Sequence, residues 1–326
     1  MDVCYYVNSG KYRQEFADLV SRGCAALGVH CSVEVPGIRS ESCTDWVSLH
    51  NPSADVAFCL GVKGNTHKII DVYRARGRHC IVIDKGYVRH GEPTFWSLNI
   101  DAMRPGVYAF EHDMPGDRWD AIMRREPPLR PLPFRTDGEF VMLLGSSPKG
   151  MRFFDHEFFV GRPLDIDTVI TVEDKDVASQ RQAAYFESIA SRLVELTQRP
   201  IYYRGRTHKS PDRFNHPTVI RDARDCKIED ALRNCWCAVS HTSNAGFNAL
   251  FNGIPVIELG IGVARVLASA RLEDVENPHV PTWDERQRWL RQLAYCQWTK
   301  NEIADGQALR HIFGVIEELR TRGDRT

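Results

Sequence analysis

Short apolar runs alternate with segments of helical periodicity along the first part of the chain. The runs have strand length, and continuous apolar strands are typical of parallel sheets that are covered on both faces. In chain order the strands are expected at Val3–Val7, Cys31–Val35, Asp55–Leu60 and His79–Asp84, and the helices at Arg13–Leu27 and Thr66–Arg76. The alternation predicts an open, doubly wound α/β sheet.

A proline-rich segment separates this region from a second one with the same alternation. Glu126–Pro133 contains four prolines in eight residues, which neither a helix nor a central strand accommodates. Beyond it, strands are expected at Glu139–Leu144, Pro200–Arg204, Cys235–Ser240 and Ile254–Ile257, and helices at Val177–Gln198, Ile228–Asn234, Ala245–Phe251 and Glu302–Arg322. Thr282 and Glu285 predict a capping box at the start of one further helix.

The two similar regions predict an α/β protein with two Rossmann-like domains facing a central cleft. We expect an N-terminal, acceptor-side domain over residues 1–130 and a C-terminal, nucleotide-sugar domain over 131–285. Helices over 286–326 are expected to pack back across both domains. Ligands of such sheets bind at loops that follow the carboxyl ends of strands, and those loops include Lys85–Arg89, Gly145–Gly150 and His241–Asn244.

Composition limits the class of protein without defining its chemistry. With 326 residues, 43% of them hydrophobic and 26% charged, the chain has the profile of a two-domain globular protein. The sequence contains no apolar run of about 20 residues and no signal-peptide pattern at its start, so we expect no membrane span and a cytoplasmic location. The scattered cysteines are interpreted as reduced core residues, and no metal site is expected.

The segment Cys237–Gly260 has the most specific pattern in the chain. A strand leads into the polar loop His241–Asn244, a helix follows, and a second strand ends at Glu258. A helix N-terminus leaves unpaired N–H groups and carries partial positive charge, so it favours a bound phosphate. The alternative is an ordinary βαβ loop in which Ser243 or Asn244 only caps the helix.

Residues 200–260 resemble the GT-B glycosyltransferases, which have two Rossmann-like domains and hold a nucleotide sugar mainly in the C-terminal one. The resemblance rests on the strand Pro200–Arg206, the loop SHTSNAG and the strand at Gly253–Ile257, which are similar to capsule-type transferases; Trp289–His311 is similar to their closing helices. It implies a metal-independent hexosyltransferase-like enzyme with no cofactor, for which we expect a UDP-sugar as co-substrate.

A donor site needs a cradle for the leaving diphosphate and a partner for the ribose. The predicted phosphate ligands are His241, Thr242, Ser243 and Asn244 with the backbone amides of Ala245 and Gly246, aided by positive charge that stabilises the leaving group. The remaining predicted donor-binding residues are Arg204, Arg206, Ser146, Lys149 and, for the ribose hydroxyls, Glu258. A surface ion pair for Arg204 and a solvated loop position for Glu258 are the alternatives.

Asp84 is the first choice for the catalytic base. It ends an apolar strand, where partial desolvation would raise the pKa of its carboxyl group toward a useful value. Asp155 and His156, which lie among phenylalanines, are the reserve candidates. The alternative for Asp84 is a capping role in the turn that follows.

The basic stretch from Leu60 to His90 is the candidate acceptor surface, with Lys85, Tyr87 and Arg89 as acceptor-binding residues. Within the group, Asp84–Arg89 and Trp96–Asn99 are faintly similar to phage-encoded transferases, some of which modify hydroxymethylated DNA bases. The acceptor is therefore either DNA with modified bases, which would need phosphate contacts and an extruded base, or a surface glycan. A solvated helix face is the alternative interpretation of the charges.

Two other functions fit the same architecture. A nucleotide-sugar epimerase would need several carboxylates in the cleft, whereas the loops here are richer in Arg, Lys and His. A non-catalytic nucleotide-binding protein would bind the donor without hydrolysing it. The absence of a GxGxxG fingerprint and of a Walker loop from the sequence argues against a dehydrogenase or a P-loop NTPase.

Overall fold

The computed structural model describes residues 1–7, 12–34, 53–61, 66–88, 93–102, 107–124, 130–135, 137–146, 175–205, 213–260 and 262–322. These residues fall into two compact units. Unit 1 contains the described residues up to 124 together with those from Arg291 onward, and unit 2 contains those from 130 to Leu290. No helix among the described residues is long and apolar enough to cross a membrane.

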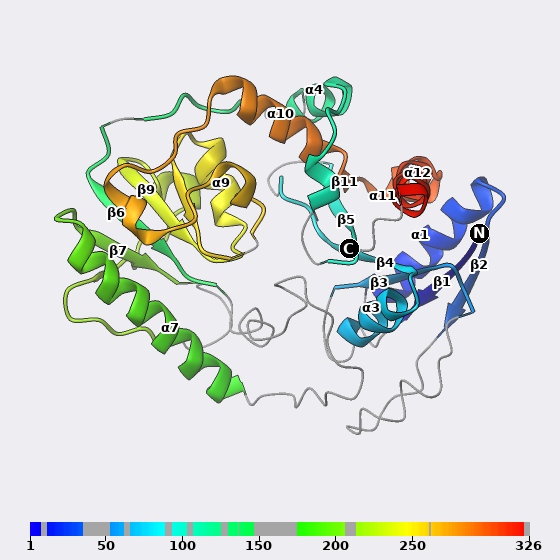
Figure 1. Cartoon of the computed structure of the whole chain (residues 1–326), viewed down its shortest axis with the longest axis horizontal. Coiled ribbons are helices and arrows are strands. Elements are labelled where there is room, and N and C mark those ends of the chain that lie inside the picture. Colours follow the sequence, from blue (N-terminus) through cyan, green and yellow to red (C-terminus); the bar gives the residue numbers. More distant parts are fainter. Residues whose placement is uncertain are drawn as a thin grey trace. The chain divides into compact units, whose positions relative to one another are not determined.

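Unit 1 is built on a six-stranded sheet in the order β11-β5-β4-β3-β1-β2 (Figure 1). The strands β1 to β4 are parallel, β5 runs antiparallel to β4, and β11 runs antiparallel to β5. Their bounds are β1 Asp2–Tyr6, β2 His30–Glu34, β3 Val56–Leu60, β4 His79–Lys85, β5 Trp96–Ile100 and β11 Gln297–Trp298. The antiparallel pair at this edge was not expected from the sequence.

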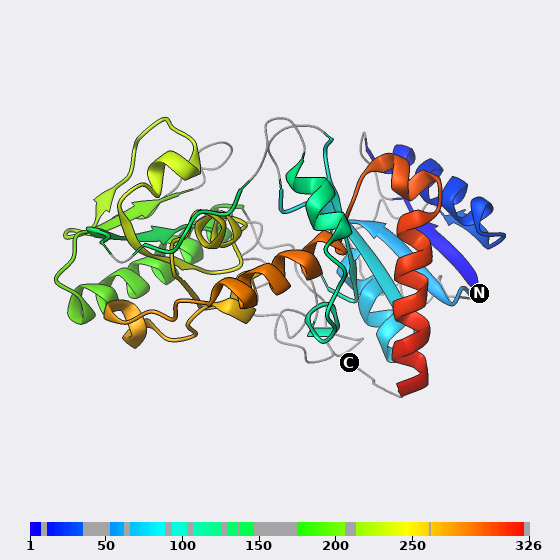
Figure 2. The same cartoon turned by 90° about the horizontal axis from the view of Figure 1, so that it is seen from above.

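Helices cover both faces of this sheet (Figure 2). Helix α1 (Arg13–Ala26) and helix α12 (Gln307–Arg322) bury apolar side chains against one face, where they share a core with alternate residues of β1, β3, β4 and β5. Helix α3 (Thr66–Ala75) covers the other face, and its Tyr73 hydroxyl meets the Tyr6 hydroxyl at 3.2 Å. The short helices are η1 (Val107–Phe110), α4 (Asp117–Met123) and α11 (Lys300–Ala304).

The single helix expected over Glu302–Arg322 is in fact two helices, α11 and α12. Thr299 and Glu302 form a capping box that starts α11. Gly306, with φ of +84°, then adopts the left-handed conformation that ends a helix. The apolar periodicity continues across the break, so periodicity alone did not reveal it.

Unit 2 is built on a five-stranded parallel sheet in the order β10-β9-β6-β7-β8 (Figure 1). Helix α7 packs on one face through Phe186, Ile189 and Leu193, and helix α9 contacts β9 and β10. The bounds are β6 Phe140–Leu144, β7 Ile201–Arg204, β8 Ile220–Arg221, β9 Cys235–Ser240, β10 Val256–Glu258, α7 Lys175–Leu196, α8 Ile228–Ala231, α9 Ala245–Phe251, η2 Arg265–Leu267, η3 Leu272–Glu276 and α10 Trp283–Ala294. The residues of α10 from Arg291 onward belong to unit 1.

The predicted fold class, α/β with two Rossmann-like units, is confirmed. The capping box before α10 is also present, because Glu285 N donates to Thr282 Oγ1 and Thr282 N donates to Glu285 Oε2. The nine cysteines that the structure describes are free.

Candidate functional site

The strand order places the switch point of unit 2 between β6 and β9. From β6 the chain adds β7 and β8 on one side and then β9 and β10 on the other. Ligands of open α/β sheets bind outside the carboxyl ends of the strands at such a point. Here those ends lead into Ser146, after β6, and into the loop His241–Asn244, after β9.

The loop His241–Asn244 has a strained backbone and internal hydrogen bonds. Thr242 has φ of +57°, a left-handed conformation that is unfavourable for a β-branched residue. Ala245 N donates to Ser243 Oγ at 3.3 Å, and Gly246 N donates to Ser243 O at 3.1 Å. These two amides were predicted to bind a phosphate; in this structure both donate within the loop, and the prediction stays a prediction.

Glu258 holds the loop from inside the protein. Its side chain has no exposed surface, and its Oε1 accepts a 2.7 Å hydrogen bond from Thr242 N. Gly246 and Gly262 lie so close that a Cβ on either would meet Glu258 Oε2 at 3.1 or 2.4 Å. The carboxylate therefore does not face an open ribose site, which corrects the predicted role of Glu258.

Ser146 and Tyr185 fix His241. The Ser146 hydroxyl donates to His241 O, joining the ends of β6 and β9, and Gln182 Nε2 donates to Ser146 O. The Tyr185 ring meets the His241 ring edge-on, with centroids 5.2 Å apart. Burial lowers the pKa of the His241 imidazole to about 4, so this side chain is neutral near pH 7. It can hydrogen bond to a ligand oxygen without contributing charge.

Arg204 belongs to an internal ion-pair cluster at the end of β7. Its Nη1 lies 2.7 Å from Asp222 Oδ2, and its Nη2 donates to Cys226 O. Arg224 Nε donates to the other oxygen of Asp222 at 2.6 Å. Burial would raise the pKa of Asp222, but hydrogen bonds from Arg224 and Arg204 hold it below its ordinary value.

The exposed fractions of the side chains in this cluster identify Arg224 as a candidate that was not predicted from the sequence. The side chain of Arg204 is 12% exposed and that of Asp222 is 1% exposed, whereas Arg224 is 48% exposed. The predicted direct phosphate contact of Arg204 is therefore replaced by an internal ion pair, and Arg224 presents the accessible positive charge. The alternating charges of Arg221–Asp225 were the available signal.

A buried arginine supports the far end of α9. Arg286, on α10, is 1% exposed and its Nη1 donates to Leu250 O at 3.0 Å, in the last turn of α9. Its guanidinium also lies 4.5 Å from the centre of the Phe134 ring. A cation at a helix C-terminus stabilises the helix dipole, so Arg286 helps to hold the helix that follows the loop.

In unit 1, the predicted catalytic and acceptor residues differ in accessibility. Asp84 and Lys85 are the last two residues of β4; Asp84 is partly exposed and Lys85 is exposed. No described side chain hydrogen bonds to the Asp84 carboxylate. Tyr87 is fully buried, and its hydroxyl donates to Asn99 Oδ1 at 3.3 Å. The prediction that Tyr87 contacts an acceptor is therefore wrong for this structure.

Several predicted site residues lie outside the described residues. They are the reserve catalytic residues Asp155 and His156, the donor-binding residues Lys149 and Arg206, and the acceptor-binding residue Arg89. Within the described part of the chain, no three His, Cys, Asp or Glu side chains are grouped so that they could hold a metal ion.

Comparisons with known proteins find likeness in fold. No protein-family model matches the chain, and no curated protein matches it. Thermosulfurimonas dismutans KpsC beta Kdo 2,4 transferase is 14% identical over 91% of this chain and 90% of its own, with a TM-score of 0.45. The 2,7 transferase of the same KpsC is 12% identical over 95% and 99%, with a TM-score of 0.47.

A third solved structure of similar fold is the Methanocaldococcus jannaschii UDP-GlcNAc 2-epimerase in complex with UDP-GlcNAc and UDP. It is 8% identical over 96% of this chain and 99% of its own, with a TM-score of 0.31. These likenesses concern the fold alone.

Proposed function

We propose that the protein is a glycosyltransferase that moves a sugar from a nucleotide-sugar donor to an acceptor hydroxyl. The supporting observation is the loop His241–Asn244 at the switch point of unit 2, which is held by Glu258 and Ser146. A loop that is fixed before the ligand arrives needs little ordering when it binds.

The donor diphosphate lies against the side chains of this loop in our proposal. Thr242, Ser243 and His241 are partly exposed and offer hydroxyl and imidazole groups. Arg224 follows β8, at the same edge of the sheet as the loop that follows β9. In our proposal the diphosphate lies between the loop and the Arg224 guanidinium.

The chemistry follows from these groups. The bond between the anomeric carbon and the diphosphate oxygen breaks, and the acceptor oxygen forms the new glycosidic bond. Positive charge from Arg224 stabilises the charge that develops on the leaving diphosphate, so no divalent metal is required. The acceptor proton passes to a carboxylate, for which Asp84 remains our proposed base. We keep a UDP-sugar as the proposed donor.

A glycan hydroxyl is a better proposed acceptor than an extruded DNA base. The base would need an aromatic surface on which to stack, and Tyr87, Phe95 and Trp96 are 0%, 6% and 8% exposed. The exposed Lys85 at the end of β4 can still contact a polar or acidic group of a glycan.

A thermal-shift screen of the full chain with UDP, GDP, CMP, TDP, ADP and their common sugar conjugates tests the donor site. A ligand at 100 times its Kd adds about 2.7 kcal/mol to stability, which is a shift of about 4 °C for a chain of this size. We expect one nucleotide to stabilise the protein, Ser243→Ala to remove the shift, and Ser188→Ala to retain it, because Ser188 is exposed on α7. If no nucleotide shifts the transition, the proposal is wrong.

The stabilising nucleotide sugar then distinguishes transfer from isomerisation. Incubated alone and followed by NMR, an epimerase would convert the donor into a second sugar nucleotide. A transferase would leave it intact or release free sugar and nucleotide slowly, and would turn it over when an acceptor glycan is added. Conversion without acceptor would replace the proposed function by the epimerase alternative.

A further inference from the structure

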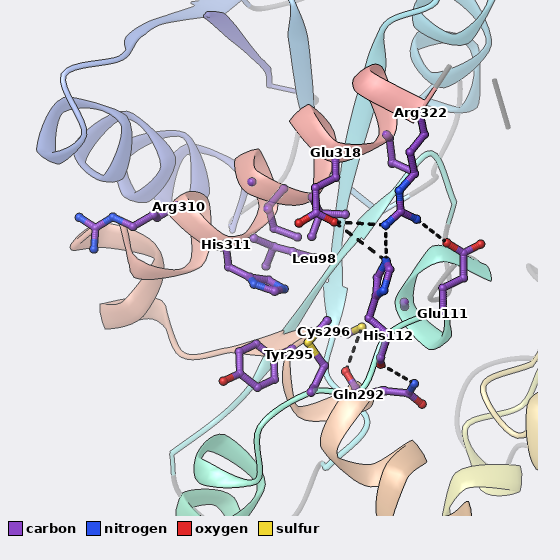
Figure 3. A pocket seen from close by; sticks show the side chains of 16 residues that line it. Leu98, Glu111, His112, Gln292, Tyr295, Cys296, Arg310, His311, Glu318 and Arg322 are labelled. Carbon is purple, nitrogen blue, oxygen red and sulfur yellow. Dashed lines mark hydrogen bonds and ion pairs between the residues drawn. The ribbon is translucent and has the colours of Figure 1, made fainter. Parts of the chain in front are cut away.

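Unit 1 contains a cavity of about 570 Å³ whose lining includes none of the candidate site residues. It is lined along its length by one face of α12, and it is completed by η1 and the segment after it, by the end of α10 and by Leu98 of β5 (Figure 3). All of its lining residues belong to unit 1.

The cavity lies on a face of the sheet, beside α12, and not at the loops that follow the parallel strands. Leu98 pairs with Ile83, two residues before the carboxyl end of β4. Near the C-terminal end of α12, Arg320 Nη2 donates to Asp55 O at 3.4 Å. Asp55 directly precedes β3, so this end of α12 lies at the amino end of that strand. The cavity therefore extends away from the carboxyl edge, so it is distinct from the position expected for a catalytic site.

One end of the cavity is polar and its charged groups interact. Arg322 Nη2 lies 2.9 Å from His112 Nε2, and Arg322 Nη1 lies 3.4 Å from Glu111 Oε2. Glu318 Oε2 is 3.9 Å from Arg322 Nη2. An arginine can only donate, so His112 Nε2 accepts in this contact, and the same nitrogen lies 4.0 Å from Glu318 Oε2.

The charged groups at the polar end pair with one another. Arg322 lies beside both Glu111 and Glu318, and in Figure 3 the Arg310 side chain extends away from the cavity. His311 also faces the cavity; burial, followed by the charge of Arg118, lowers the pKa of its imidazole. The cavity therefore offers hydrogen-bonding imidazoles and paired ions, which favours an uncharged ligand over a strongly anionic one.

The rest of the lining combines apolar side chains with planar side chains that carry polar atoms. Val315 and the Tyr295 ring supply apolar contact area, and the Tyr295 ring lies 5.0 Å from the His311 ring. Gln292 Nε2 donates to the backbone oxygens of Phe110 and His112.

We propose that this cavity is a saccharide-binding site, separate from the donor site, that takes an uncharged mono- or disaccharide unit. A sugar ring has apolar C–H faces that pack on aliphatic and aromatic side chains. Its neighbouring hydroxyls match pairs of coplanar donors or acceptors, which carboxylates, guanidinium and imidazole groups provide. Purely apolar ligands would leave these polar groups without partners, at a cost in affinity.

The inference goes beyond the proposed function, because saccharide binding here requires no catalysis. If the protein transfers sugars, the cavity would retain a glycan chain near the enzyme while a different part of that chain reacts.

The test uses the full chain, saturation-transfer NMR and titration calorimetry with maltose, cellobiose, lactose and N,N′-diacetylchitobiose. We expect at least one of them to bind saturably with a Kd below about 10 mM. Gly314 lies on the cavity side of α12, and a Cβ there would meet nothing within 4 Å. Gly314→Leu should therefore fill the entrance without disturbing α12 and weaken binding by about tenfold or more, whereas Gly314→Ala, the matched control, should change it by less than about twofold.

A second variant separates neutral from charged ligands. Glu318→Gln keeps a planar hydrogen-bonding group but removes the charge, so it should change saccharide affinity by less than about threefold. Spermidine and a short oligonucleotide serve as charged probes. The proposal is overturned if none of the four saccharides binds saturably, if Gly314→Leu leaves their binding unchanged, or if Gly314→Leu abolishes binding of a charged probe instead.

These outcomes are independent of the donor site. Nucleotide stabilisation that depends on Ser243 should persist in Gly314→Leu, and saccharide binding should persist in Ser243→Ala. Loss of nucleotide binding alone therefore counts against the proposed function, and loss of saccharide binding alone counts against this site.

Discussion

The backbone N–H of Thr242 donates a 2.7 Å hydrogen bond to Oε1 of Glu258, a carboxylate with no exposed surface. Thr242 follows β9 and Glu258 ends β10, so the bond joins the ends of two neighbouring parallel strands. Glu258 thus holds the candidate phosphate loop from inside the protein. The groups that the loop offers to the proposed ligand are therefore side chains.

Glu258→Ala should destabilise unit 2. The change leaves Thr242 N–H buried without its acceptor and removes the volume of a buried side chain, which together cost about 2–4 kcal/mol. Glu258→Gln retains an oxygen acceptor and should cost about 1 kcal/mol. Urea unfolding of both variants measures the difference, and equal stability of Glu258→Ala and wild type would contradict the role given to this bond.

Thr242→Gly separates the backbone of the loop from its side chain. Glycine adopts the left-handed conformation without strain, so the variant should match or exceed wild-type stability by about 1 kcal/mol. Nucleotide binding should nevertheless weaken, because the hydroxyl is lost. Asn234, which has φ of +67° outside the loop, provides the control: Asn234→Gly should leave nucleotide binding unchanged. Retained binding in Thr242→Gly would show that the hydroxyl does not contact the ligand.

Much of the fold could be predicted because its strands and helices have simple local signals. The apolar run at β9, the polar loop and the helix Ala245–Phe251 appear in the structure where the pattern placed them. The strand β5 was missed because Trp96–Ile100 has no regular alternation, and its pairing with β11 joins residues about two hundred positions apart. Such long-range pairings leave no periodic signal.

The roles of individual polar residues were harder to predict than their positions. The sequence places Arg204 and Glu258 at the ends of strands, which is correct. It does not show that Asp222, which lies at the same edge of the sheet, pairs with Arg204. It also does not show that Gly262 packs directly against the Glu258 carboxylate. Whether a charged side chain faces a ligand or a buried partner depends on such tertiary contacts, and only the structure supplies them.

The pH dependence of stability should reflect His241. The pKa of its imidazole is about 4 in the folded protein because of burial, against an ordinary value of 6.5. The unfolded chain therefore binds a proton between these values that the folded chain does not. The contribution to stability is full above pH 6.5 and is lost as the pH falls toward 4, by up to about 3 kcal/mol.

His241→Gln removes this proton and should flatten the profile over that window. Urea unfolding at pH 7.0, 5.5 and 4.5 compares the two proteins, and an NMR titration of the ring protons follows the imidazole directly. An imidazole that titrates near pH 6.5 in the folded wild type would refute the prediction.

Arg204 and Arg224 share the carboxylate of Asp222 in the ion-pair cluster at the end of β7. Asp222→Ala leaves the largely buried Arg204 without its partner, so it should destabilise unit 2 by about 3 kcal/mol. Arg224→Ala removes an accessible arginine while Arg204 still pairs with Asp222. Its stability cost should be below about 1 kcal/mol, but its nucleotide affinity should fall about tenfold or more, because a charge-assisted contact to phosphate is lost.

Arg233→Ala is the matched control, because Arg233 is 74% exposed and pairs only locally with Asp230 among the described residues. It should change neither stability nor nucleotide affinity. Calorimetric titration with the nucleotide found in the screen, at low and at high salt, measures the effect. Since a phosphate contact weakens as salt rises, wild type should lose more affinity with salt than Arg224→Ala does. Equal salt dependence in the two proteins would place Arg224 outside the donor site and return the search for the phosphate-binding charge to the remaining basic residues of this edge.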